Sequence, residues 1–177
     1  TSNEYDADVP PVEPGIVISS NTTTPSTNTS IVSKILKDIK KNKKKAVIKY
    51  EKKFSNNNRI KPTSFEINQA IRFLDPRVKR AINYAYERIY KYHSLQKVKN
   101  IKFRDKLNNI IHYKSVSINK VGIYVPANLP STLLMNAIPA KIAGVKKIIL
   151  VNPRLNKRLN PAVIYAARKL GIKEIYS

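Results

Sequence analysis

The sequence contains no cysteine and no tryptophan, and only four of its 177 residues are glycine. The absence of cysteine excludes disulfide bonds and any metal site built from thiolates. The four glycines are too far apart to form G-x-G-x-x-G, the phosphate-binding fingerprint of many dinucleotide-binding folds. No apolar run approaches the ~18 residues that a membrane-spanning helix needs. No secretory signal is visible, so the sequence predicts a cytoplasmic protein without a membrane partner.

Negative charge is also scarce, because 34 Lys and Arg residues stand against 11 Asp and Glu residues and leave a net charge of +23. Such a charge attracts phosphate, so a basic module that binds nucleic acid is one hypothesis. The cations are mostly lysines, however, and they are spread along most of the chain instead of forming one stripe. A biased composition therefore explains the charge better, and nucleic acid is the less favoured partner.

The first 30 residues are expected to form a disordered tail, because their acidic, Pro-rich and Ser/Thr/Asn-rich stretches contain too little apolar surface to offset the entropy of ordering. Helical patterns then follow one another over residues 31–97, which we expect to form a helical arm. Val47, Tyr50 and Phe54 are the predicted buried stripe of its second helix. The predicted helices are residues 31–41, 46–54, 64–74 and 76–92, and the predicted N-caps are Ser30, Thr63 or Ser64, and Asp75.

Aromatic and cationic side chains alternate along the last of these helices, at Tyr84, Tyr86, Arg88, Tyr90 and Tyr92. This pattern is similar to a stacking surface for single-stranded nucleic acid. A packed helix with half-buried tyrosines, whose hydroxyl groups reach water, explains the same residues and is the favoured interpretation.

Residues 98–119 are predicted to connect the arm to a sheet, with a short strand pair formed by 101–103 and 110–116. Residues 120–177 then alternate between strand and helix patterns. The three expected strands are β-branched residues at 121, 123 and 125, a continuous apolar run over 148–151, and residues 172–176. The continuous run is typical of a parallel strand that is covered on both faces.

Capping residues delimit the two helices between these strands. Pro130, Ser131 and Thr132 are expected to open the first helix, and Asn160 with Pro161 the second. Gly144 and Gly171 follow the two helices, where a residue with positive φ is favoured. The predicted fold class is therefore α/β, with an N-terminal helical arm followed by half of a Rossmann-like parallel sheet (βαβαβ). The domain is incomplete, so we expect an unpaired edge strand and an uncovered apolar face.

A ligand of such a sheet lies beyond the carboxyl ends of the strands. Residues 126–131 lie there and lead into a helix N-terminus, whose free N–H groups and dipole suit a pyrophosphate. This loop contains no glycine, so the backbone at Ala127 and Asn128 cannot approach a phosphate as closely as two glycines could. His112 has no second ligand at a metal-like spacing, so the residues alone indicate no metal site.

Residues 120–177 contain three motifs: GIYVP (122–126), PSTLLMNAIPAKIAGVKKIILVNP (130–153) and NPAVIYAARKLGIKEIYS (160–177). Together they resemble the first βαβαβ unit of the histidinol dehydrogenase family. The helical region carries further matches at Val32, Ile35, Asp38 and Ile39, at Tyr50 and Phe54, and at Ile89, Tyr92, His93 and Gln96. The resemblance covers about residues 31–177.

This resemblance implies an oxidoreductase of histidine biosynthesis, which oxidises L-histidinol to L-histidine in two steps with NAD and zinc. It also implies an intertwined homodimer to which the helical arm contributes. Tyr124 would contact the dinucleotide, and Pro126 and Asn128 would line the same edge. A tyrosine packed in the core is the open alternative for Tyr124.

Several family motifs are missing from this sequence. The glycine pair after GIYVP is absent and the loop is shorter, while the family's GGAQA segment, zinc ligands and catalytic Glu–His pair would follow Ser177. We therefore expect an N-terminal fragment that is inactive alone and has no catalytic or zinc-binding residue of its own. A decayed, non-catalytic remnant is the alternative.

Overall fold

A computed structural model of the protein describes residues 27–57 and 59–177. The chain divides between Lys43 and Lys44 into two compact units. The predicted disordered tail lies outside the described residues except for residues 27–30, which are helical.

Helix α1 (Thr27–Ser55) consists of two helices joined at Lys43, whose backbone is not helical (φ 50, ψ −128). The break predicted between residues 41 and 46 is confirmed. Like charges four residues apart, such as Lys40 and Lys44, disfavour a continuous helix here. Two other predictions were wrong. Ser30 lies inside the helix and does not cap it. Phe54, which was predicted to be buried, is 63% exposed, whereas Ala46 of the same segment is 2% exposed.

Helices α2 (Ser64–Arg72) and α3 (Pro76–Ser94) begin at the predicted N-caps. Thr63 Oγ1 accepts a hydrogen bond from the Glu66 backbone N–H at 3.2 Å, and the Glu66 carboxylate accepts one from the Thr63 N–H at 2.7 Å. This reciprocal pair is a capping box. Asp75 caps α3 by accepting from the Arg77 N–H at 2.7 Å.

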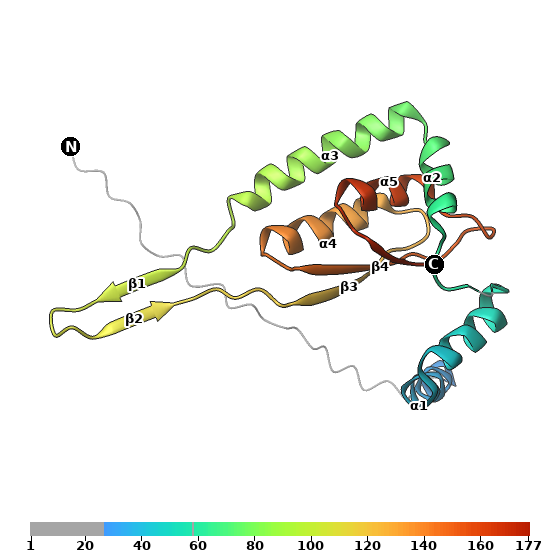
Figure 1. The fold of residues 1–177 in the computed structure, drawn as a ribbon, viewed down its shortest axis with the longest axis horizontal. Coiled ribbons are helices and arrows are strands. Elements are labelled where there is room, and N and C mark those ends of the chain that lie inside the picture. Colours follow the sequence, from blue (N-terminus) through green and yellow to red (C-terminus); the bar gives the residue numbers. More distant parts are fainter. Residues whose placement is uncertain (1–26, 58) are drawn as a thin grey trace. The chain divides into compact units, whose positions relative to one another are not determined.

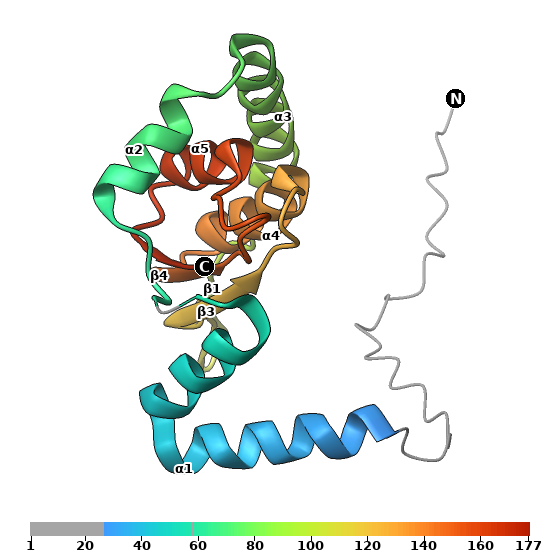
Figure 2. The ribbon, with the colours of Figure 1, turned by 90° about the vertical axis from the view of Figure 1, so that its right-hand side faces the viewer.

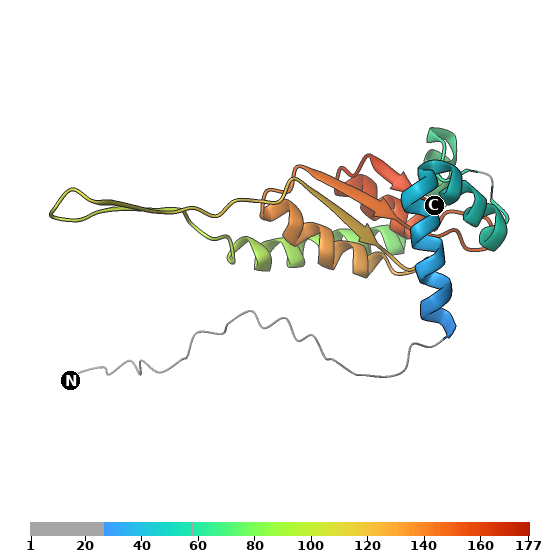
Figure 3. The same cartoon turned by 90° about the horizontal axis from the view of Figure 1, so that it is seen from below.

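The parallel sheet contains β3 (Lys120–Tyr124), β4 (Lys147–Val151) and β5 (Glu174–Tyr176), in that order. Helix α4 (Pro130–Ile142) connects β3 to β4, and α5 (Pro161–Lys169) connects β4 to β5. The expected βαβαβ unit is therefore confirmed. Figures 2 and 3 show both helices on the same side of the strands, as two right-handed crossovers in the same direction require.

Helices α2 and α3 share a core with the sheet, although the sequence placed them in a separate arm. Figure 1 shows α3 beside α4 and α2 beside α5. Ile82 of α3 is 5% exposed and belongs to the core, because the apolar stripes of α2 and α3 cover the outer surfaces of α4 and α5. The largest fully buried side chains are Val125, Leu133, Leu134, Ile138, Leu150, Asn152, Val163, Ile164 and Leu170.

The predicted strand pair of the connector is also present. Strands β1 (Ile101–Arg104) and β2 (Ile110–Tyr113) form an antiparallel hairpin, with Phe103 opposite Ile111. Every residue of both strands is exposed, so the hairpin contributes nothing to the core of the sheet unit.

Only one face of the three-stranded sheet is covered by α4 and α5. Leu150 points into the core and is fully buried, whereas its neighbour Val151 on the opposite face is 40% exposed. The expectation that β4 is covered on both faces was therefore wrong for the described residues. The opposite face carries neither α4 nor α5 and is exposed at Tyr124 and Val151, so the expected uncovered face is confirmed for the described residues.

Helices α4 and α5 differ in how their N-termini are capped. Asn160 caps α5, since its Oδ1 accepts from the N–H groups of Ala162 and Val163. The N-cap of α4 is Leu129, which makes no side-chain cap, because the predicted capping residues Ser131 and Thr132 already lie in the first turn. The residues after the two helices have positive φ as predicted, 90° at Gly144 and 68° at Gly171.

A partly buried ion pair ties α2 to the chain that follows β4. The guanidinium group of Arg154 donates to the Glu66 carboxylate at 2.8 Å, and Arg154 Nε donates to Ser177 Oγ at 3.2 Å. The Arg154 hydrogen bond, together with the Thr63 N–H, lowers the pKa of Glu66 from 4.5 to about 2. Glu66 therefore stabilises the fold as a carboxylate.

We expect Glu66→Gln to lower the free energy of unfolding near neutral pH by about 2 kcal/mol. A lowered native pKa stabilises the fold above the ordinary pKa, and this contribution disappears as the pH falls through the native value. The difference in the free energy of unfolding between the wild type and Glu66→Gln, measured in urea, should thus decrease to about zero as the pH falls from 4.5 to about 2. Glu87→Gln, at an exposed position on α3, is the control, and a difference that persists at pH 2 would contradict this role.

Candidate nucleotide site at the carboxyl edge of the sheet

The carboxyl ends of the three strands carry a row of side chains on the uncovered face. Tyr124, Val151 and Tyr176 are neighbours in the register, since Tyr124 pairs with Val151 and Val151 pairs with Tyr176. Residues opposite one another on neighbouring strands point to the same face of a sheet. Tyr124 is 65% exposed, so the alternative that it packs in the core is wrong.

The other two predicted site residues, Pro126 and Asn128, lie in the loop between β3 and α4. Pro126 is half-buried and Asn128 is exposed. The loop closes with a hydrogen bond from the Leu129 N–H to the Pro126 carbonyl at 3.3 Å. Tyr124 lines a groove on the uncovered face, whereas Pro126 and Asn128 do not line that groove. Of the three predicted residues, only Tyr124 therefore lies along this groove.

Asn152 is a site residue that the sequence analysis missed. It is fully buried directly after β4, and its Nδ2 donates to the carbonyls of Val125 and Pro126 at 3.0 and 3.1 Å. Its backbone N–H donates to the Tyr176 carbonyl at 2.9 Å. Asn152 thus ties the ends of all three strands together. The sequence feature that could have indicated Asn152 is an amide residue immediately after the apolar run of β4.

The Oδ1 atom of Asn152 is buried and has no hydrogen-bond partner within the described part of the chain. Buried polar atoms are usually paired, and an acceptor of this kind can receive a hydrogen bond from a hydroxyl group or a water. The first turn of α4 also has no side-chain cap. Free N–H groups at a helix start favour an anion.

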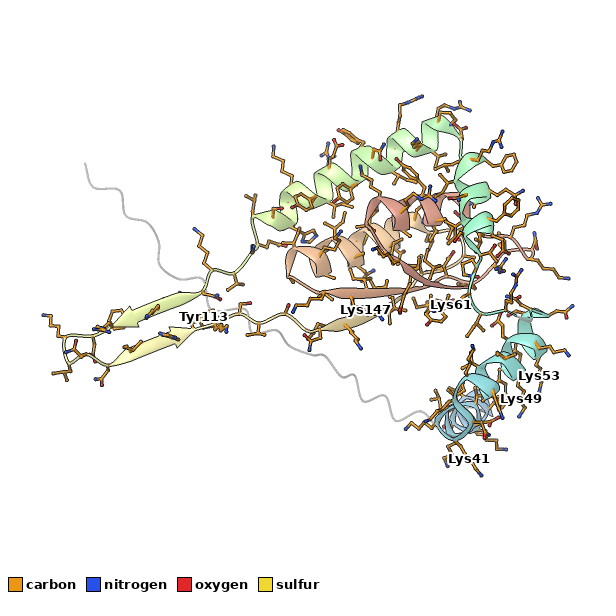
Figure 4. The ribbon with its side chains drawn as sticks, viewed as in Figure 1. Lys41, Lys49, Lys53, Lys61, Tyr113 and Lys147 are labelled. Carbon is orange, nitrogen blue, oxygen red and sulfur yellow. The ribbon has the colours of Figure 1, made fainter. Side chains whose placement is uncertain are left out.

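A groove of about 940 Å³ lies over the row of side chains, and all its lining residues belong to the unit of residues 44–177. Residues 44–55 of α1 contribute Val47, Ile48 and Glu51 to it. Three cations, Lys44, Arg59 and Lys61, also line the groove. Figure 4 shows Lys61 close to the carboxyl ends of the strands, and its ammonium nitrogen lies 4.8 Å from the centre of the Tyr176 ring.

These features fit a nucleotide better than a metal ion. An exposed tyrosine can contact the base of a nucleotide. The uncapped start of α4 and the cations of the groove can contact its phosphates. No group of three or more His, Asp or Glu side chains that could hold a metal occurs among the described residues. The described donor set therefore does not fit zinc.

Among the described residues, no helix combines the length and the apolar character that a membrane span requires.

A parallel sheet in the order β3-β4-β5, with a helix between successive strands, has the architecture of one half of a Rossmann-type α/β fold. Comparison with known families is more specific. The family model of histidinol dehydrogenase matches residues 19–177, and the chain belongs to this family.

Individual relatives agree with the family model. The histidinol dehydrogenase of Pelagibacter ubique is 56% identical over 153 residues, which cover 85% of this chain and 36% of the relative. The histidinol dehydrogenase of Carboxydothermus hydrogenoformans is 34% identical over 152 residues. A crystal structure of histidinol dehydrogenase from Elizabethkingia anophelis superposes with a TM-score of 0.79 at 35% identity, over 88% of this chain and 37% of that chain. This chain thus spans little more than a third of the length of its relatives.

Proposed function

We propose that this chain forms the N-terminal part of an NAD-dependent histidinol dehydrogenase and supplies one side of its dinucleotide site. The observation that carries the proposal is Tyr124, which lies exposed at the carboxyl end of β3 within a motif of that family. The reaction would be the oxidation of L-histidinol to L-histidine, with NAD as the hydride acceptor. A cytoplasmic location is part of the same proposal.

Each residue of the edge would have a binding role. The Tyr124 ring would contact the dinucleotide, and the loop with Pro126 and Asn128 would border it. Asn152 would hold that loop in place through its two hydrogen bonds. The zinc proposed for the whole enzyme would be held outside the described residues, which offer no suitable ligand set. We therefore assign no catalytic residue to this chain.

We also propose a homodimer to which the helical arm contributes. Three large apolar side chains of α1 support this, because Ile31, Val32 and Leu36 are 52%, 52% and 54% exposed. Val32 and Leu36 are four residues apart and therefore lie on one side of the helix, and exposed apolar side chains on one side favour burial against another surface.

A chimera tests the proposed function. Residues 19–177 replace the matching segment of the Pelagibacter ubique enzyme, which is 56% identical. We expect the chimera to produce NADH from NAD and histidinol, whereas the purified 177-residue chain produces none. In the chimera, Tyr124→Ala should raise the KM for NAD about tenfold with little change in kcat, because it removes a contact made in both ground and transition states.

The chimera also separates the proposal from the alternative of a decayed remnant. The loop lacks the glycine pair of the family, and this absence favours decay, because a loop without glycine approaches a phosphate less closely. A folded chimera without activity would support decay and overturn the proposed function. Activity that is unaffected by Tyr124→Ala would remove this residue from the cofactor site.

A further inference from the structure

The floor of the groove on the uncovered face contains Val151 between two tyrosines, Tyr124 and Tyr176. Tyr124 and Tyr176 flank Val151 on three adjacent strands, so their attachment points lie roughly 9–10 Å apart. This spacing leaves room for a planar group to lie on Val151 between the two rings. Val151 is 40% exposed and is therefore accessible.

The segment that carries Lys61 is fixed beside this floor. The Ser177 N–H donates to the Ile60 carbonyl at 3.0 Å, and Asn57 Nδ2 donates to the Ser177 carbonyl at 3.3 Å. Lys61 thereby remains next to β5, with its ammonium group over the Tyr176 ring. The ring face attracts the ammonium group, so this contact favours the position of Lys61 beside the floor of the groove.

The groove has an excess of positive charge. Lys44, Arg59 and Lys61 line it together with one acid, Glu51. The nearby Glu174 carboxylate is already paired with Lys147 at 2.7 Å, and the ion pair between Arg59 and Glu66 is long, at 3.9 Å. The groove therefore suits an anionic ligand with an apolar, planar part.

We infer that this groove binds the phosphate-bearing part of a nucleotide, with Lys61 as the phosphate partner and Tyr124 and Tyr176 around the base. The inference rests on the proposed function. It assigns the phosphate contact of the cofactor site to a residue outside the loop after β3. That loop has no glycine, so its backbone N–H groups are poorly placed to surround a phosphate. A side-chain ammonium group would take over this role from the opposite side of the edge.

The test titrates the 177-residue chain with ADP-ribose and with adenosine, which lacks phosphate. We expect Lys61→Ala to weaken ADP-ribose binding about tenfold and to leave adenosine binding within about twofold, since only a phosphate uses the lost charge. Lys169→Ala is the matched control, because its ammonium group lies 4.6 Å from the Tyr86 ring outside the groove. This control should change neither affinity.

Any of three results would overturn the inference. Lys61→Ala could weaken the binding of ADP-ribose and of adenosine by the same factor, Lys169→Ala could weaken ADP-ribose binding as much as Lys61→Ala does, or the wild-type chain could fail to bind ADP-ribose. Stronger binding of a single-stranded oligonucleotide than of ADP-ribose would also overturn it and favour a nucleic-acid surface. The NAD-dependent activity of the chimera is a separate measurement. An active chimera with a failed titration thus rejects the Lys61 site alone, whereas an inactive chimera rejects the proposed function.

Discussion

Asn152→Asp is expected to destabilise the protein by about 4 kcal/mol, because it places an acceptor where a buried donor is required. Asn152 is fully buried, and its Nδ2 donates to the carbonyls of Val125 and Pro126. In the variant a carboxylate oxygen would face both carbonyl oxygens, and all three groups would lack a donor. Equilibrium unfolding in urea measures the loss.

Asn136→Asp is the matched control for this substitution. Asn136 is exposed on α4, and its Nδ2 also donates to a backbone carbonyl, that of Thr132, at 2.7 Å. Water can replace that hydrogen bond, so we expect a loss of less than about 1 kcal/mol. Equal effects of the two substitutions would contradict the role of Asn152 as the residue that ties the strand ends together.

Leu150→Ala should lower the free energy of unfolding by about 3 kcal/mol, since it opens a cavity at the centre of the core. Leu150 is fully buried in the middle strand and pairs with Ile123 of β3 and Ile175 of β5 in the register. All three side chains lie on the face that α4 and α5 cover. Thermal and urea unfolding of the purified chain measure this effect.

Val151→Ala, one residue further along β4, is the control for Leu150→Ala. Val151 points to the uncovered face and is 40% exposed, so it loses less buried surface, and we expect a cost below about 1 kcal/mol. A larger effect at Val151 than at Leu150 would contradict the assignment of the covered face.

The sequence by itself determined the features that depend on neighbouring residues. Thr63, Asp75 and Asn160 cap helices because each side chain reaches an N–H two or three residues away. Gly144 follows α4 because a positive φ suits glycine. The motifs around GIYVP identified the family, since they preserve residue types at fixed spacings.

The tertiary structure decided the features that depend on residues far apart in the chain. The apolar run of β4 does not tell which face is covered, and only the direction of both crossovers places α4 and α5 on one side. The position of Lys61 over Tyr176 depends on the hydrogen bonds that Asn57 and Ile60 make with Ser177, directly after β5. Asn152 has its role because β3 and β5 end beside it. The local sequence around each residue contains no information about such neighbours.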